Sequence, residues 1–183
     1  MLRLTMLGSR NVFLVGPMGS GKTAVGRQLA RQLRAPFFDT DAEIERDTGV
    51  DIPYIFECEG EQGFRDREAA VIDALTCREG IVLATGGGAV LRAENRRHLA
   101  KRGCVVYLET SVAQQAGRVG RSCQRPLLRN VDPVRKLEQL MAERAPLYRE
   151  VADLIVGTDG RSVRVVVDDI LRELRSREPL SQP

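Results

Sequence analysis

Residues 16–23 read Gly-Pro-Met-Gly-Ser-Gly-Lys-Thr and directly follow the apolar run 11–15. This is the phosphate-binding loop pattern G-x-x-x-x-G-K-[ST], in the position that such a loop requires, between a predicted buried strand and a predicted helix. Its glycines let backbone N–H groups turn inward around a polyphosphate, and the positive end of the following helix faces the same anion. Lys22 can reach the β- and γ-phosphates, and the Thr23 hydroxyl can ligate Mg²⁺. The pattern predicts a nucleoside triphosphate site; the alternative is a glycine-rich turn that binds nothing.

The composition is typical of an ordinary globular protein. The chain has 183 residues, of which 29% are charged and 43% hydrophobic, enough for one domain with a full core. A net charge of +3 is too small to indicate a nucleic-acid partner. The four cysteines show no C-x-x-C spacing, so we expect no zinc site, and scattered thiols fit a reducing cytoplasm. No apolar stretch approaches the roughly 20 residues of a membrane span, so no membrane association is expected.

Short β-like runs alternate with amphipathic helical patterns. Strands are expected at 11–16, 36–38, 81–85, 104–108 and 153–156. Helices are expected near 21–34, 40–48, 61–78, 92–102, 111–119, 132–150 and 161–176. This alternation predicts an α/β fold in which a parallel sheet carries helices on both faces. We expect a single domain over 1–183 with a core at about 11–176, a mobile lid at about 117–131 and flexible ends at 1–9 and 178–183. We also expect a monomer, because no long apolar seam is evident.

Three predicted strands are followed by segments suited to a ligand site. The phosphate loop follows the first, Asp39 and Asp41 follow the second, and Gly86–Gly88 follow the third. Ligands in open α/β sheets bind beyond the carboxyl ends of the strands, so these segments should meet in one cleft. One carboxylate could hold water around Mg²⁺, and the other could accept a proton from a substrate hydroxyl. The alternatives are that Asp39 or Thr40 only caps the next helix and that the glycines form a plain turn.

Two arginines fall on predicted buried helix faces. At about 100° per residue, Arg144 lies at the centre of an apolar stripe made of Val134, Leu137, Leu140, Met141 and Tyr148. An unpaired buried guanidinium is very costly, so Arg144 must meet either a core acid or an anionic ligand.

The helix at 61–78 has a similar arrangement. Glu68 lies in its stripe of Phe64, Val71 and Leu75, and Arg65 stands three residues earlier, within reach of Glu68. The pair is either purely structural or a rigid mount for a binding arginine. Two preset arginines suggest that the acceptor carries a carboxylate.

Residues 110–131 contain no acid but hold four arginines, Arg118, Arg121, Arg125 and Arg129. Glycines and Pro126 break up the later part, which predicts a helix followed by a mobile loop. A lid that carries arginines onto a phosphoryl-transfer site would expel water and stabilise the transferring charge. The alternative is a basic loop exposed to solvent. For Arg121 and Arg129 individually, we favour this alternative.

Six segments, in order between about 11 and 175, carry a family resemblance. They are the phosphate loop, Asp39-Thr-Asp41, Gly63-Phe-Arg-Asp-Arg-Glu68, Gly86–Gly88, Arg125-Pro-Leu-Leu128 and Arg144-Ala-Pro-Leu-Tyr148. Together they resemble the shikimate kinases. The resemblance implies a P-loop kinase fold with a five-stranded parallel sheet and a mobile lid. It also implies transfer of the γ-phosphate of ATP to the 3-hydroxyl of shikimate, a step towards chorismate and the aromatic amino acids.

The resemblance further implies roles for single residues at the nucleotide. Lys22 would hold the transferring phosphate, and Thr23 would hold Mg²⁺ with Asp39 behind it through water. Arg125 would close from the lid onto phosphate, Arg118 would lie over the nucleotide, and Arg161 would flank the adenine. The implied nucleotide-binding set is Gly19, Ser20, Gly21, Lys22, Thr23, Ala24, Arg118, Arg125 and Arg161.

At the acceptor, Asp41 would grip the shikimate hydroxyls and is the best candidate for proton acceptor. Arg65, Arg144 and the Gly87 backbone would bind the acid and the ring. The implied catalytic set is Lys22, Asp41 and Arg125. Members commonly read Gly-Lys-Ser-Thr where this chain has Ala24 in the last position. The loss of that hydroxyl, which could meet the α-phosphate, should lower nucleotide affinity modestly.

Three rival functions can be weighed on the sequence. The nearest rival is another small-molecule kinase of the same fold, for example of gluconate or nucleotide type. Arg65 and Arg144 together with Asp41 argue against a neutral or nucleobase-bearing acceptor. A GTP-dependent switch would need the N-K-x-D and usually the D-x-x-G strings, and the chain contains neither. A silent binding protein would not need Lys22 and Thr23 together with Asp41 and Arg125.

Overall fold

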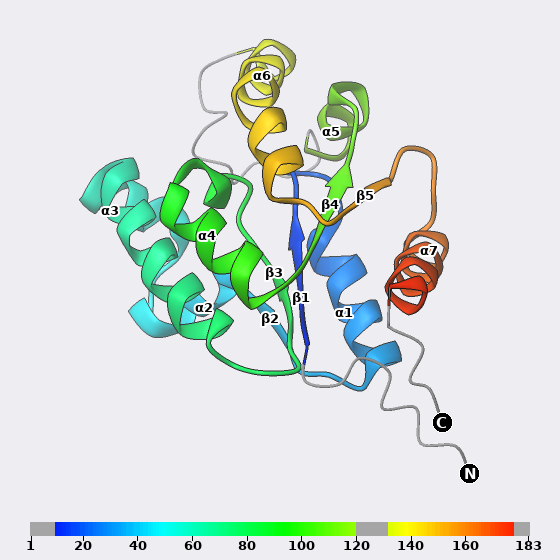
Figure 1. Ribbon diagram of the computed structural model, residues 1–183. Helices are drawn as coiled ribbons and strands as arrows, with labels where there is room; N and C mark the ends of the chain where they lie inside the picture. Colours follow the sequence, from blue (N-terminus) through cyan, green and yellow to red (C-terminus); the bar gives the residue numbers. More distant parts are fainter. Residues whose placement is uncertain (1–9, 120–131, 178–183) are drawn as a thin grey trace.

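A five-stranded sheet forms the centre of the protein. The computed structural model describes residues 10–119 and 132–177 (Figure 1). The strands are β1 (Asn11–Val15), β2 (Phe37–Asp39), β3 (Val82–Ala84), β4 (Gly103–Glu109) and β5 (Leu154–Gly157). They lie in the order β2-β3-β1-β4-β5, and every neighbouring pair is parallel. The predicted α/β fold with a five-stranded parallel sheet is confirmed.

Helices cover both faces of this sheet. Their bounds are α1 (Lys22–Leu33), α2 (Thr40–Thr48), α3 (Ile52–Thr76), α4 (Ala93–Arg102), α5 (Val112–Val119), α6 (Pro133–Val151) and α7 (Val163–Ser176). Val12 and Leu14 of β1 pack with α1 and α7 on one face, whereas Phe13 and Val15 pack with α3, α4 and α6 on the other. A strand buried on both sides explains why the first apolar run shows no alternation.

Helix α3 differs most from its prediction. It begins at Ile52, not near residue 61, and is interrupted at Gly60, where φ is 69° and ψ is −178°. The Asp51 side chain caps its start by accepting from the Tyr54 N–H, and Pro53 follows in the first turn. The sequence analysis missed this first part because Gly60 breaks the helical pattern.

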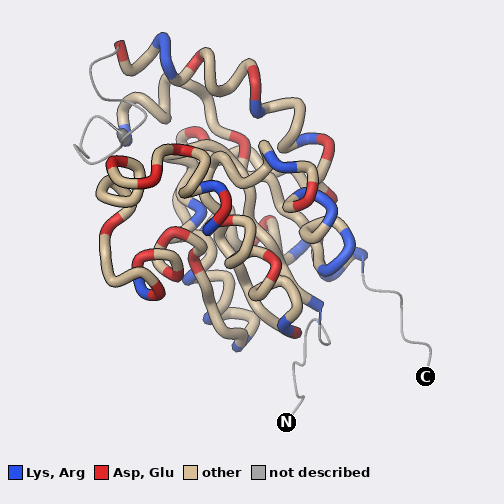
Figure 2. The backbone as a smooth tube through the Cα atoms, turned by 90° about the vertical axis from the view of Figure 1, so that its left-hand side faces the viewer, with Lys and Arg blue, Asp and Glu red and all other residues tan. Residues whose placement is uncertain are grey.

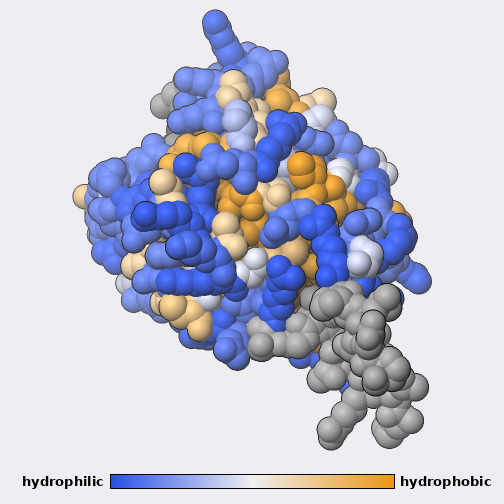
Figure 3. Space-filling model, viewed as in Figure 1, coloured by the Kyte–Doolittle hydropathy of each residue, from blue (hydrophilic) through white to orange (hydrophobic). Residues whose placement is uncertain are grey.

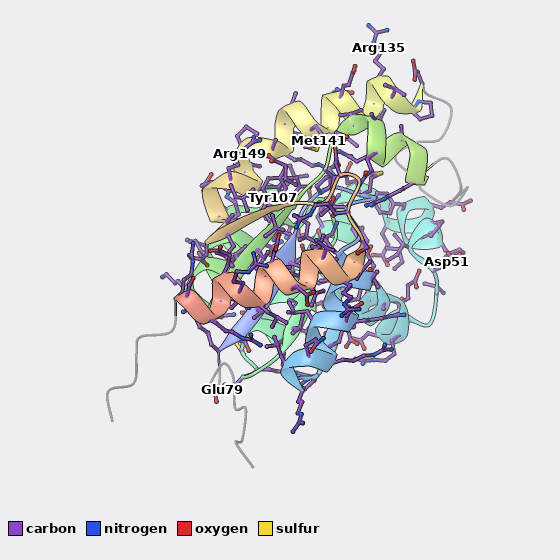
Figure 4. All side chains as sticks on the ribbon, turned by 90° about the vertical axis from the view of Figure 1, so that its right-hand side faces the viewer. Asp51, Glu79, Tyr107, Arg135, Met141 and Arg149 are labelled. Atoms are coloured by element: carbon purple, nitrogen blue, oxygen red, sulfur yellow. The ribbon has the colours of Figure 1, made fainter. Side chains whose placement is uncertain are left out.

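Helix α6 confirms most of the predicted buried stripe. Leu137, Leu140 and Tyr148 are buried, but Val134 is 45% exposed, so its assignment to the core was wrong. The first turn of α6 extends beyond the body of the protein, and Figure 4 shows Arg135 projecting into solvent from this end. Pro146 lies inside the helix, which continues to Val151.

The surface carries charges of both signs. Figure 2 shows acidic and basic residues interspersed along the helices, and Figure 3 shows hydrophilic side chains over most of one face with apolar ones near its middle. Within residues 10–119 and 132–177, no helix combines the length and the apolarity needed to cross a membrane. The predicted flexible ends and most of the predicted lid lie outside the described residues.

Candidate active site

The loop between β1 and α1 wraps around the Lys22 ammonium. Lys22 Nζ donates to the Gly16 carbonyl at 2.8 Å, to the Pro17 carbonyl at 2.7 Å and to Ser20 Oγ at 3.3 Å. Gly16 and Gly21 have φ of 146° and 89°, values that side chains of L-residues rarely allow. A Cβ at Gly16 would also lie 2.7 Å from the Leu108 carbonyl oxygen. The glycines of the motif are therefore required by the shape of the loop.

A cavity of about 520 Å³ lies at the carboxyl ends of the strands. Segments that follow three strands border it: the phosphate loop after β1, Asp39 and Asp41 after β2, and Gly86 and Gly87 after β3. The structure thus brings together the three segments that the sequence analysis placed in one cleft. Arg65 and Arg144 are not among the residues that line this cavity.

Thr23 and Asp39 offer oxygen atoms side by side at the cavity. Thr23 Oγ1 donates to Asp39 Oδ2 at 2.7 Å, while Asp39 Oδ1 accepts from the Asp41 and Ala42 N–H groups and caps α2. The capping interpretation is confirmed, and it leaves the second carboxylate oxygen directed at Thr23. A hydroxyl and a carboxylate are hard ligands of the kind that Mg²⁺ prefers, so these residues fit the ion that the family resemblance implies.

Arg118 and Arg161 approach the cavity from the other side. Arg118 Nη1 donates to the Gly19 carbonyl at 2.7 Å, so α5 is tied to the phosphate loop. Arg161 Nη1 donates to the Gly157 carbonyl at 2.9 Å, and its Nη2 pairs with Asp169. Both arginines line the cavity. The lid arginines Arg121, Arg125 and Arg129 lie outside the described residues.

The turn at Gly86–Gly88 runs tightly against charged side chains. A Cβ at Gly86 would lie 2.4 Å from Glu68 Oε1 and 3.0 Å from Asp41 Oδ1, and one at Gly88 would lie 2.3 Å from Arg65 Nη2. No other residue type fits at these two positions without displacing the charged groups. The turn therefore connects the cavity, through Asp41, with the Arg65–Glu68 pair behind it.

Arg65 and Glu68 form a buried ion pair on α3. Arg65 Nη1 lies 2.6 Å from Glu68 Oε2, the two residues are 8% and 0% exposed, and Glu61 lies 3.2 Å from Arg65 Nη2. Burial raises the pKa of Glu68, and the charges of Arg65 and Arg144 oppose that rise. Burial lowers the pKa of Arg65, but the negative charges and hydrogen bonds of Glu68 and Glu61 raise it by more, so the net pKa of Arg65 is raised. The predicted Arg65–Glu68 pair is present, and Glu61 adds a second acidic contact to Arg65.

Among the described residues, Arg144 is buried without an acidic partner. It is 5% exposed, and within the described residues no carboxylate lies at ion-pair distance and Nε has no hydrogen-bond partner. Its charge acts on Glu68, and it interacts with the Tyr148 hydroxyl both through its charge and through a side-chain hydrogen bond. The alternative of an ion pair with a core acid is not realised in the part of the chain that the structure describes.

Comparisons with known proteins agree with this geometry. A family model described as shikimate kinase matches residues 18–175. The shikimate kinase of Pseudomonas syringae pv. syringae (strain B728a) is 56% identical over 170 residues, which are 93% of this chain and 99% of that protein. The chain belongs to the shikimate kinase family. The solved shikimate kinase from Acinetobacter baumannii, in complex with shikimate, matches with a TM-score of 0.93 and 49% identity over 95% of this chain and 97% of that one.

A structure of a gluconate-type kinase is also similar. The gluconokinase from Sinorhizobium meliloti 1021 matches with a TM-score of 0.58 but is only 18% identical. This likeness shows that the fold is shared and nothing about the acceptor. The comparisons therefore support the shikimate kinase family over the gluconate-type alternative.

The sequence analysis did not single out Thr40, Tyr148 or Thr158 as site residues. Thr40 Oγ1 accepts from the Gly86 N–H at 2.8 Å, the Tyr148 hydroxyl donates to the Gly87 carbonyl, and Thr158 lines the cavity. The one signal available was Tyr148 itself, because a tyrosine in a buried stripe needs a partner for its hydroxyl.

Ala24 allows a direct test of the departure from the family pattern. It is exposed in the first turn of α1 and lines the cavity, so a larger side chain fits there. We expect Ala24→Thr to lower the KM for ATP roughly two- to fivefold, because one hydrogen bond is gained. Ala24→Val is the matched control, since it adds the same bulk without the hydroxyl. An equal effect of both variants would assign the change to packing alone.

Proposed function

We propose that the protein transfers the γ-phosphate of ATP to the 3-hydroxyl of shikimate and so forms shikimate 3-phosphate, on the route to chorismate and the aromatic amino acids. The observation that carries the proposal is a phosphate loop that borders the cavity beside the Gly86–Gly88 turn, together with a buried Arg144 that has no ion-pair partner among the described residues. The relative from Acinetobacter baumannii, solved with shikimate, supports the choice of acceptor.

The nucleotide half uses the loop and the start of α1. Backbone N–H groups of residues 19–24 surround the phosphates, and the Lys22 ammonium, now held by loop carbonyls, moves onto the transferring phosphate. Thr23 and Asp39 would hold Mg²⁺, Asp39 through water. The ion, when bound, neutralises charge on the β- and γ-phosphates. Arg118 lies over the nucleotide, Arg161 flanks the adenine, and Arg125 closes onto the phosphate.

The acceptor half orients an organic acid. Arg65 and Arg144 bind the carboxylate, and Arg144 gains there the anion that it lacks among the described residues. Within the described residues the Gly87 N–H donates to no acceptor, so it can bind the ring substituents. The 3-hydroxyl oxygen attacks the γ-phosphorus, the bond to the β–γ bridging oxygen breaks, and the hydroxyl proton passes to Asp41. The proposal includes a cytoplasmic monomer.

The acceptor is tested by ADP release from the full chain. We expect the rate with ATP and shikimate to exceed the rates with gluconate, with a nucleoside monophosphate and with no acceptor by about 100-fold or more. The ring of shikimate fixes its hydroxyls relative to the carboxylate, whereas gluconate is a flexible open chain and a nucleoside monophosphate has no carboxylate. A comparable rate with gluconate, or without any acceptor, would refute the proposal.

The role of Asp41 is tested by its amide. We expect Asp41→Asn to lower kcat by roughly 100-fold, because an amide cannot accept the hydroxyl proton. The matched control is Asp47→Asn, an exposed position on the same helix, which should leave kcat within twofold. If Asp41→Asn retained kcat within threefold, Asp41 would only position the hydroxyl.

A further inference from the structure

The Gly86–Gly88 turn is held in place by hydroxyl groups from two other elements. Thr40, at the start of α2, accepts the Gly86 N–H at 2.8 Å, and Tyr148, near the end of α6, donates to the Gly87 carbonyl. Both residues are fully buried. The Gly86–Gly87 peptide, which carries the Gly87 N–H, is therefore flanked along the chain by two hydrogen-bonded groups, the Gly86 N–H and the Gly87 carbonyl.

The local backbone bonds of the turn leave the Gly86 N–H and the Gly87 carbonyl to partners from elsewhere in the chain. A Cβ at Gly86 would lie 2.4 Å from Glu68 Oε1 and one at Gly88 2.3 Å from Arg65 Nη2, so a larger residue at either position would displace the buried ion pair. Glycine has the largest backbone freedom of any residue, and without side chains the turn has no packing of its own. The Ala89 N–H donates to the Gly86 carbonyl at 3.2 Å and the Leu91 N–H to the Gly88 carbonyl at 3.0 Å, but both bonds are local. Among the described residues, the side chains that hydrogen-bond to the turn backbone from elsewhere in the chain are those of Thr40 and Tyr148.

Tyr148 is well placed for this task. It follows Arg144 by one helical turn, so both side chains lie on the same face of α6. Its ring stacks on Tyr107, with centroids 5.0 Å apart and planes inclined by 25°. Burial raises the pKa of Tyr148, which keeps the hydroxyl protonated and able to donate to a carbonyl. One side chain thus links the carboxylate-binding arginine to the glycine turn.

We propose that the Tyr148 and Thr40 hydroxyls are positioning groups, which hold Gly87 where its backbone meets the phosphate acceptor. Neither hydroxyl touches the reacting atoms. The inference rests on the proposed function, because it concerns the acceptor half of the same site. It predicts that the loss of either hydroxyl weakens binding of the acceptor much more than binding of ATP.

The stacked tyrosines supply a matched pair of variants. Tyr107 and Tyr148 are both fully buried, but the Tyr107 hydroxyl has no hydrogen-bond partner among the described residues. Figure 4 shows Tyr107 inside the body of the molecule. We expect Tyr148→Phe to raise the KM for shikimate about tenfold and to leave the KM for ATP within about twofold. Tyr107→Phe should leave both constants within about twofold, although it removes the same atom from the same stack.

Steady-state kinetics with both substrates varied, on the full chain, decide the matter. Thr40→Val, which keeps the shape of the side chain, provides the second test and should give the same split between the substrates. The inference is overturned if both Tyr148→Phe and Thr40→Val leave the shikimate KM unchanged, if the two KM values rise equally, or if Tyr107→Phe matches Tyr148→Phe. If Tyr148→Phe does not fold, Thr40→Val alone decides. A native chain that does not phosphorylate shikimate would instead refute the proposed function.

Discussion

Replacing Lys22 with methionine should nearly abolish turnover and leave the fold intact. The loop places the ammonium within 2.8 Å of the Gly16 and Pro17 carbonyls, at the start of the helix that faces the phosphates. A positioned cation that stabilises charge on the transferring phosphoryl group contributes roughly 10³-fold or more to kcat. Methionine keeps the length of the side chain but carries no charge. ADP release under saturating ATP and shikimate measures the effect.

The control for Lys22→Met is Lys101→Met, an exposed lysine on α4. It should leave kcat within twofold, and circular dichroism should show the native fold for both variants. The thermal midpoint of Lys22→Met should fall by a few degrees, because the Gly16 and Pro17 carbonyls lose the ammonium that donates to them. A Lys22→Met enzyme with kcat within tenfold of the native value would remove Lys22 from the phosphate site.

The features that could be predicted from the sequence are those with a local cause. The phosphate loop is one continuous motif, and the Arg65–Glu68 pair follows from helical spacing of three residues. The convergence of Asp39, Asp41 and Gly86 follows from the parallel sheet, since the carboxyl ends of its strands meet at one edge. These predictions needed only periodicity and strand order.

The features that escaped prediction depend on contacts distant in sequence. Tyr148 reaches Gly87 across 61 positions, and no helical pattern indicates where its hydroxyl points. Gly60 hides the first part of α3, because a break in the periodic pattern looks the same as the start of a new helix. Val134 fits the stripe of α6 but lies beyond the sheet that would bury it. Arg125 lies outside the described residues and stays a prediction.

The two arginines of the proposed acceptor site should respond oppositely to removal when no ligand is bound. Arg65→Met leaves Glu68, which is 0% exposed, without the guanidinium 2.6 Å away. An uncompensated buried charge is strongly destabilising, so we expect the thermal midpoint to fall by roughly 5 °C or more. Arg144→Met strands no carboxylate, because within the described residues Arg144 has no ion pair. Its thermal midpoint should stay the same or rise.

In catalysis the same two variants should look alike. Each variant removes a charge-assisted contact to the substrate carboxylate. For Arg144→Met, kcat/KM for shikimate should fall by roughly 10³-fold, mostly because KM for shikimate rises. The KM for ATP should change by about twofold at most. The thermal midpoint, measured without ligand and with saturating shikimate, distinguishes a binding role from a structural role. Arg144→Met should lose the rise in midpoint that shikimate gives the native protein. An Arg144→Met variant that is destabilised as much as Arg65→Met, or that raises both KM values equally, would make Arg144 a structural residue. Burial of this cation without an ion-pair partner among the described residues is explained if a substrate anion joins it during the reaction, and the change in midpoint with and without shikimate tests that explanation.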